Sequence, residues 1–354
     1  MEFSEDEILL DFSNCTKVDF SVLFLLKVIL EEYLNTLKKL QSKLQIKRIL
    51  PLVKIRKSKN DSVNKNLIAN EILKSANVKI NDTEFIPIST TSLIKGSKTQ
   101  DLYSENRKGL AVTKIRSLIN QGLFSHKYCL SDSGVGHLDG LISEILNNAE
   151  DHSQFNTWYA YGNLFETKKK DDKSDIVGEI NLAVLNFGYS IFEGFEGTKN
   201  ENHAVYDDMN NLYNEVINNN GGKLNFSQEQ MFTLFSLQEG FSRLKYNEDS
   251  RGTGTIKFIR SFLNLGDYED ASRDFKPHLL IYSGNTLIKC DNLYKPFMLD
   301  SVYYLSLNSE NDMRKPPVKS HLCNLENRFP GTFLVVKIYL NEKHLNTKLE
   351  KNDK

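Results

Sequence analysis

The sequence lacks the features that mark several large classes of protein. Its 4 cysteines are spread over 354 residues and form no C-x-x-C pair, so we expect reduced thiols and neither a zinc site nor a disulfide framework. It also lacks an excess of charge of either sign, since 45 Lys and Arg oppose 46 Asp and Glu. A net charge of -1 provides no bulk attraction to nucleic acid or to an anionic membrane, so nucleic acid is not indicated as a partner.

Long apolar runs are absent as well. The most apolar stretch, Val22 to Leu30, is interrupted by Lys27 and followed by Glu31 and Glu32, and it is too short to span a bilayer. The first residues, MEFSEDE, are acidic where a secretory signal would be basic. We therefore expect a cytoplasmic protein that does not enter a membrane.

The length and the local patterns predict two domains. Strand-like runs at 8–13, 48–54 and 83–88 alternate with helical periodicity after Asp19, which is placed to cap a helix, and over 66–78. We predict a small α/β module over 1–92, a polar linker over 93–107, an α+β domain over 108–341 and a frayed tail over 342–354. In the larger domain, helices are expected at 108–121, 136–151, 201–218, 227–238 and 252–263, and strands at 156–166, 178–187 and in apolar runs up to residue 340.

The segment 138–153, LDGLISEILNNAEDHS, carries the clearest chemistry. Its apolar residues form one helical stripe, and Glu144 and Asn148 stack on one flank because they lie four residues apart. An amide oxygen can ligate Mg²⁺, which otherwise keeps phosphate oxygens and waters. A carboxylate one turn away can orient or deprotonate a water that attacks a phosphoryl group. Taken alone, the segment is better explained as a surface helix with ordinary polar residues.

The run EILNNAEDHS resembles the N-box of GHKL ATPases, the group that contains gyrase, histidine kinases and the mismatch-repair ATPase. It supplies Glu144, Asn148, Ala149, Asp151 and His152 in the family's order. The resemblance implies that Asn148 is the magnesium ligand and Glu144 the general base, with Asp151 and His152 near the phosphates or supporting the base. A role as a helix C-terminal cap remains open for His152.

A second run, LAVLNFGYSI at 182–191, is similar to the family's adenine-binding box of Asp, any residue, Gly, any residue, Gly. Asn186 occupies the Asp position, Gly188 the first Gly and Ser190 the second Gly. In the family, the carboxylate accepts a hydrogen bond from the adenine amino group. Asn186 can accept through its oxygen, but its NH₂ group adds a donor, which leaves the base preference open.

A third run, SRGTGTIKFIRSF at 250–262, resembles the family's second glycine box. Glycines that open a helix let a phosphate approach backbone N–H groups at the positive end of that helix. The resemblance implies a nucleotide-binding role for a contiguous set of residues: Arg251, Gly252, Thr253, Gly254 and Thr255. The preceding residues, 238–252, would form a lid that nucleotide orders.

A fourth run, FPGTFLVVKIYL at 329–340, is similar to the Gly-Thr that opens the family's last strand. Gly331 and Thr332 fit, and the Thr hydroxyl would help to bind adenine through water. The four motifs occur in the family's order across most of 130–340. Together they imply a GHKL-type α/β sandwich, a mixed sheet with helices on one face, that binds ATP and Mg²⁺.

The N-terminal module bears a fainter resemblance to STAS domains. Those domains often carry an Asp-Ser-Ser/Thr-Gly turn that a kinase phosphorylates, whereas this chain has Asp19, Phe20, Ser21 and Val22. Ser21 is the only candidate acceptor and the Gly is missing, so we interpret the module as STAS-like and suited to docking. An unrelated α/β unit is the alternative.

These resemblances give three functional hypotheses. The first is an ATP-driven conformational switch in a signalling or defence-type assembly, acting on a protein partner or a second copy of the chain. The second is a serine/threonine kinase of the anti-sigma type that acts on a STAS partner. The third is a nucleotide-binding scaffold without turnover, against which the presence of Glu144 argues.

Overall fold

The chain folds into two compact units, residues 1–88 and 89–354. The computed structural model describes residues 8–45, 53–72, 89–97, 103–151, 153–166, 176–239, 241, 254–265 and 276–341. The boundary lies four residues before the predicted end of the small module. The tail over 342–354, the strand expected over 83–88 and the hairpin tip between the two long strands lie outside the described residues.

Among its described residues, the N-terminal unit has the parallel strands β1 (Ile8–Asp11) and β2 (Val53–Arg56) and the helices α1 (Phe20–Leu44) and α2 (Asp61–Ala69). Parallel neighbours need a crossover connection, and α1 lies in it. The predicted cap is confirmed, because Asp19 Oδ1 accepts a hydrogen bond from the Ser21 backbone N–H at 2.9 Å. The Ser21 hydroxyl donates to the same oxygen and is buried, so this side chain completes the start of the helix.

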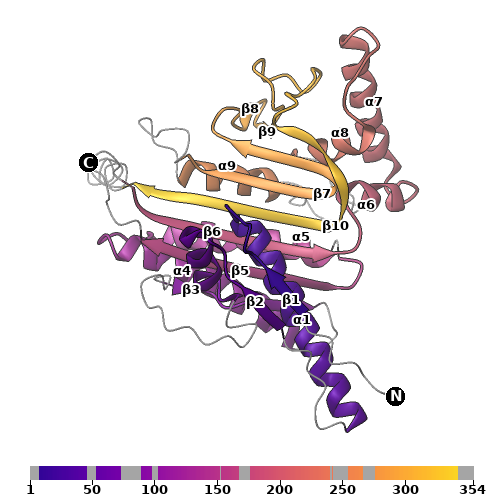
Figure 1. Ribbon diagram of the computed structural model, residues 1–354. Coiled ribbons are helices and arrows are strands. Elements are labelled where there is room, and N and C mark those ends of the chain that lie inside the picture. Colours follow the sequence, from indigo (N-terminus) through magenta and orange to yellow (C-terminus); the bar gives the residue numbers. More distant parts are fainter. Residues whose placement is uncertain are drawn as a thin grey trace. The chain divides into compact units, whose positions relative to one another are not determined.

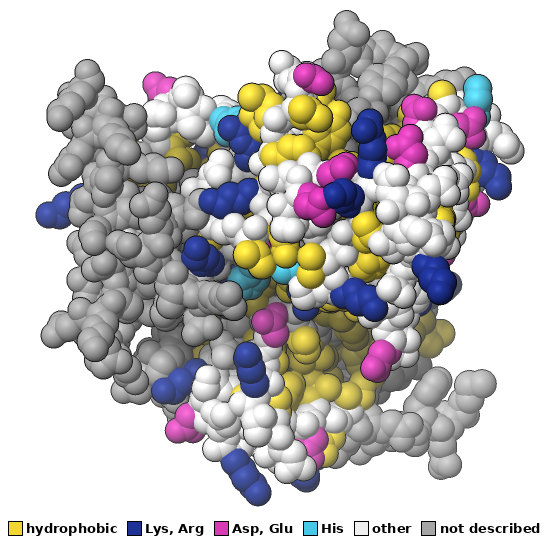
Figure 2. Space-filling view, turned by 90° about the horizontal axis from the view of Figure 1, so that it is seen from above, with side chains coloured by type: hydrophobic (Ala, Val, Ile, Leu, Met, Phe, Trp, Pro, Cys, Tyr) yellow, Lys and Arg dark blue, Asp and Glu magenta, His cyan; other side chains and the backbone are white. Residues whose placement is uncertain are grey.

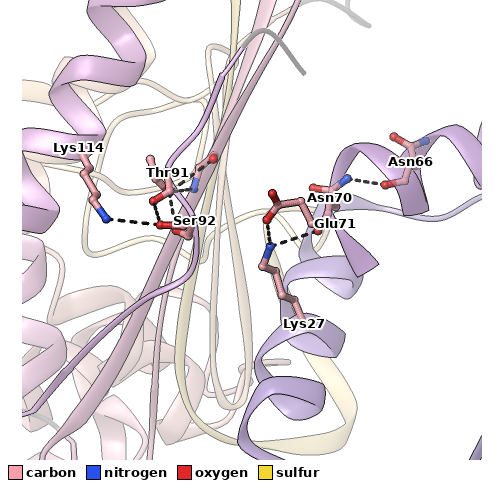
Figure 3. Close-up of polar contacts among 8 residues, drawn as sticks. Lys27, Asn66, Asn70, Glu71, Thr91, Ser92 and Lys114 are labelled. Carbon is pink, nitrogen blue, oxygen red and sulfur yellow. Dashed lines mark hydrogen bonds and ion pairs between the residues drawn. The ribbon is translucent and has the colours of Figure 1, made fainter. Parts of the chain in front are cut away.

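A buried ion pair joins α1 to the end of α2. Lys27 has a side-chain exposure of 2%, and its Nζ lies 2.6 Å from Glu71 Oε2 (Figure 3). The Asn70 carbonyl accepts a second hydrogen bond from the same ammonium group, at 3.4 Å. A buried charge is stable only when it is paired and hydrogen-bonded, and these two partners supply that pairing.

The C-terminal unit is built on a large sheet with the strand order β3-β5-β6-β10-β7, and β4 also pairs with β5. All its described pairings are antiparallel, so the predicted mixed sheet was wrong. Strands β6 and β7 do run in the same direction, but β10 inserts between them and pairs with both. The bounds are β3 (Ser89–Thr90), β4 (Ile94–Ser97), β5 (Thr157–Glu166), β6 (Ile176–Phe187), β7 (His278–Asp291) and β10 (Leu322–Asn341), with a separate hairpin of β8 (Phe297–Leu299) and β9 (Val302–Tyr304).

The predicted linker over 93–107 was wrong, because this stretch contributes to the sheet and to a helix. Strand β4 pairs with β5, and its Ile94 is buried. Just before it, the Thr91 backbone N–H donates to the Gly162 carbonyl at 3.0 Å, and Lys114 Nζ lies 3.4 Å from Ser92 Oγ (Figure 3). Strands this short carry too little apolar periodicity to be distinguished from a loop in the sequence.

Several helices of this unit pack on one face of the sheet, as expected. Figure 1 shows α4, α5 and α9 on the same side of it. A single apolar core joins these helices to alternate residues of the strands, such as Trp158, Leu182 and Val336. The bounds are α4 (Tyr103–Phe124), α5 (Asp132–Asp151), α6 (Ile191–Thr198), α7 (His203–Asn219), α8 (Gln228–Phe235) and α9 (Gly254–Leu265); all except α6 lie where helices were predicted.

Two surface properties bear on possible partners. In the part of the chain that the structure describes, no helix is long and apolar enough to cross a bilayer. On the face drawn in Figure 2, basic and acidic side chains are interspersed over the described surface and do not gather in one basic patch.

Candidate functional site

Helix α5 presents the predicted pair of polar side chains on one flank. Glu144 and Asn148 are both partly exposed, whereas Leu141, Ile145 and Ala149 of the same helix are buried in the core. Asp151 is exposed at the last position of the helix, and His152 lies outside the described residues. The apolar stripe therefore holds the helix against the sheet and leaves the carboxylate and the amide one turn apart at the surface.

Asn148 meets the helix that follows the third motif. Its Nδ2 donates to Thr255 Oγ1 at 3.3 Å, across 107 residues of sequence. Helix α9 begins at Gly254, so this contact lies in its first turn. A second contact, between His137 Nε2 and Ser261 Oγ at 3.0 Å, holds the two helices side by side further along. Two motifs that the sequence offered separately thus adjoin in the structure.

This contact also orients the Asn148 amide. Because Nδ2 donates to Thr255, Oδ1 is left to accept a hydrogen bond or to ligate a cation. The described residues contain no group of three or more His, Cys, Asp or Glu side chains that could hold a metal ion by themselves. A Mg²⁺ site at Asn148 would accordingly take its remaining ligands from phosphate oxygens and water, which is the usual mode for this ion.

The second and fourth motifs meet at the end of the sheet. Asn186 of β6 pairs in register with Thr332 of β10, and Thr332 Oγ1 lies 3.1 Å from Ser283 Oγ of β7. Asn186 is 2% exposed, and its Nδ2 has no hydrogen-bond partner among the described residues. Other buried atoms of this unit share that property, among them Asn120 Oδ1, Asp139 Oδ1, Asn181 Oδ1 and Thr286 Oγ1. Asp139 lies in the segment 138–153 but outside its N-box run, and Asn186 lies in the second motif.

Two glycines make this junction possible. Gly188 has a φ of +128°, and a Cβ there would lie 2.4 Å from Gln154 Cβ. Gly331 has a φ of +134°, and a Cβ there would lie 2.1 Å from the Asn186 carbonyl oxygen. Side chains are disfavoured at both positions by the backbone conformation and by the lack of space. These are the glycines that the second and fourth motifs contributed.

Ser190, predicted to contact nucleotide, caps helix α6. Its hydroxyl accepts from the Glu193 backbone N–H at 3.1 Å, and Glu193 Oε2 accepts from the Ser190 backbone N–H at 2.8 Å. Arg328 of β10 forms an ion pair with the same carboxylate. Burial by itself would raise the pKa of Glu193, but the Ser190 N–H and the Arg328 guanidinium outweigh it and hold that pKa below its ordinary value.

Two serines that the motifs did not nominate as site residues complete the arrangement. Ser153, after α5, places its Oγ 3.2 Å from the Phe187 carbonyl, which ties the end of α5 to the end of β6. Ser283 accepts a hydrogen bond from the Ile191 backbone N–H at 2.8 Å and so ties β7 to the start of α6. The one sequence signal for Ser283 is a polar residue in the apolar run PHLLIYSG. Ser153 is the last residue of the N-box run EILNNAEDHS, but the family's pattern assigns it no role.

Part of the third motif cannot be placed. Arg251, Gly252 and Thr253 lie outside the described residues, as do most residues of the expected lid over 238–252. Gly254 and Thr255 are described and begin α9 as predicted. The structure therefore brings together Asn148 with Thr255 in one cluster and Asn186 with Thr332 in another.

Comparisons with known proteins found no match to this chain among protein-family models, curated proteins or solved structures.

Proposed function

We propose that the C-terminal unit binds ATP with Mg²⁺ in the manner of GHKL ATPases, between the end of the sheet and helices α5 and α9. The observation that carries the proposal is the contact of Asn148 with Thr255, because it joins the N-box to the second glycine box. The alignment of Asn186 with Thr332 at the strand ends supports an adenine-binding site of the GHKL type there.

At the phosphate end, Asn148 would ligate the cation through Oδ1, and the start of α9 would direct its free backbone N–H groups at the phosphates. Magnesium, when bound, neutralises phosphate charge. Glu144 lies one turn before Asn148 on the same flank, so its carboxylate can reach a water placed next to the terminal phosphate and accept its proton. Glu144 thus gives the site the means for hydrolysis.

At the base end, Asn186 offers an acceptor and a buried donor with no described partner. An unpaired buried donor costs free energy, so a ligand that presents an acceptor to it would be favoured. An adenine ring can satisfy both atoms of an amide, as it does when Asn pairs with adenine elsewhere. Thr332 and Ser283 would supply hydroxyl groups beside it.

The test of the binding site is Mg-ATP titration of Asn148→Ala. Affinity should fall by about tenfold or more, since the loss of a hydrogen bond to a charged group costs about 1.5–3 kcal/mol. Asn147→Ala is the matched control: this neighbouring amide is exposed, faces another flank and hydrogen-bonds Lys108 at 3.1 Å. Equal Mg-ATP affinity in Asn148→Ala and wild type would remove the assignment.

The fate of labelled ATP distinguishes the three hypotheses. With labelled ATP, release of free phosphate supports a switch that hydrolyses ATP, in a signalling or defence-type assembly. Label that appears on a STAS-like protein supports the kinase of the anti-sigma type. ATP that stays bound and unchanged supports the scaffold.

A further inference from the structure

Three polar side chains lie in a row across strands β6, β10 and β7. Asn186 pairs with Thr332, and Thr332 pairs with Ser283. Residues directly opposite each other in antiparallel strands point to the same face. This is the face that carries the helices, because Val184 and Leu334, two residues away on their strands, lie in the core that joins sheet and helices. A ligand between the end of the sheet and the helices would therefore meet all three side chains together.

Each group in this row can either donate or accept a hydrogen bond. Asn186 has an acceptor on Oδ1 and a donor on Nδ2, which is buried and has no hydrogen-bond partner among the described residues. Thr332 Oγ1 and Ser283 Oγ lie 3.1 Å apart, and either hydroxyl can be the donor. The row therefore carries no charge and sets no fixed pattern of donors and acceptors.

The carboxylate beside this row is already engaged. Glu193 lies in the first turn of α6, and the Ile191 backbone N–H of the same helix donates to Ser283. Glu193 Oε2 accepts a hydrogen bond from the Ser190 backbone N–H at 2.8 Å, and Arg328 forms an ion pair with this carboxylate. Glu193 thus does not replace the carboxylate that the adenine-binding box of GHKL ATPases has at the position of Asn186.

The replacement of a carboxylate by an amide matters because purines differ at one edge. Adenine presents an amino donor at position 6 and an acceptor at N1, whereas guanine presents an acceptor at O6 and a donor at N1. A carboxylate only accepts, so at position 6 it favours adenine and repels the oxygen of guanine. An amide that turns by about 180° exchanges its donor and acceptor with little change of shape, so it can pair with either base.

We infer that the nucleotide site accepts 6-oxopurine triphosphates, the class that contains GTP, as well as ATP, because Asn186 stands where the family has a carboxylate. The inference rests on the proposed function, since it concerns the base end of the same site. Affinities for the magnesium complexes of ATP and of a 6-oxopurine triphosphate should lie within about tenfold of each other, because the amide leaves no buried group unpaired with either base.

Titration of the full chain with Mg-ATP and with magnesium inosine triphosphate (Mg-ITP) tests the inference. ITP differs from ATP only at positions 1 and 6 of the base, so the comparison isolates the edge that Asn186 would contact. An affinity for ATP more than about tenfold above that for ITP would overturn the inference and leave the proposed function standing. Binding of neither nucleotide would remove the proposed function itself.

Two variants test the residue and the shared site. Asn186→Asp should keep ATP binding and lose about 10- to 100-fold in ITP affinity, because two acceptors would then face each other in a buried place. Asn148→Ala, at the phosphate end, should lower the affinities for ATP and ITP by the same factor. Unchanged ITP affinity in Asn186→Asp, or unequal factors in Asn148→Ala, would overturn the inference. Thermal unfolding checks that each variant folds, and the wild-type comparison of ATP with ITP decides the matter if Asn186→Asp does not.

Discussion

The two units treat their buried polar groups differently. In the N-terminal unit, Lys27 is buried and both Glu71 and the Asn70 carbonyl accept hydrogen bonds from it. In the C-terminal unit, Asn186 is buried with a donor that has no described partner, and Asn148 uses its donor but leaves its acceptor available. Since buried polar groups are normally paired, the first pattern indicates a structural role, whereas the second is the one that the proposed nucleotide would complete.

The largest expected effect is the loss of ATP turnover when Glu144 is replaced. Glu144→Gln should keep ATP affinity and lose about 10²–10⁴-fold in turnover, since Gln is nearly isosteric but cannot take up a proton at neutral pH. Single-turnover phosphate release and ATP affinity, measured on one preparation, check this. Wild-type turnover in the variant would mean that the base lies elsewhere, and absent turnover in the wild type would favour the scaffold.

Removing one partner of the buried ion pair should produce the next largest effect. Glu71→Ala should lower the unfolding free energy of the N-terminal unit by up to about 3–5 kcal/mol, because it removes the carboxylate that pairs with the buried Lys27 ammonium. The exposed pair of Arg56 and Asp11, 2.8 Å apart, offers a control in the same unit. Asp11→Ala should lower the unfolding free energy far less, because solvent screens an exposed ion pair.

Hydrogen exchange of the α1 backbone amides, followed at increasing denaturant concentration, reports the unfolding of the N-terminal unit alone. Nucleotide affinity at the C-terminal unit should be unchanged in both variants wherever that unit stays folded. Similar losses in Glu71→Ala and Asp11→Ala would show that the buried pair has no special structural role.

A smaller effect is expected at the junction of the strand ends. Gly331→Ala should destabilise the C-terminal unit by about 1–3 kcal/mol and weaken ATP binding, because it forces a strained backbone conformation and a contact with the Asn186 carbonyl. Gly109→Ala is the control, since a Cβ at that helical position meets nothing within 4 Å. Thermal unfolding with and without Mg-ATP separates the effect on stability from the effect on binding. A Gly331→Ala variant as stable as the wild type would argue against the close approach of the strands.

The smallest expected effect is the contribution of Glu193 to the free energy of unfolding, and it depends on pH. Its pKa is lowered in the folded state, so its contribution to stability is present above the ordinary value of 4.5 and is lost as the pH falls through the lowered pKa. Glu193→Gln should therefore cost stability at pH 7, by about 1 kcal/mol or less for so exposed a pair, and much less under strongly acidic conditions. Denaturant unfolding of both proteins at the two pH values checks this. A difference that grew on acidification would contradict the assigned direction.

Local sequence patterns were enough to predict where several helices lie and which of their faces is buried. Asp19 signalled the start of α1, and the apolar stripe around Leu141 fixed both the existence of α5 and the flank that carries Glu144 and Asn148. Helical and strand periodicities repeat every few residues, so a single segment is enough to reveal them. The sequence order of the four motifs also sufficed to nominate the site residues.

Only the tertiary structure decided how distant segments pair. The sequence does not indicate that β10 inserts between β6 and β7, which makes the described sheet antiparallel, or that β4 joins the sheet in place of a linker. It also does not place Thr255 against Asn148, because 107 residues separate them. Such pairings depend on which surfaces bury the most apolar area together, a property of the whole core that no single segment encodes.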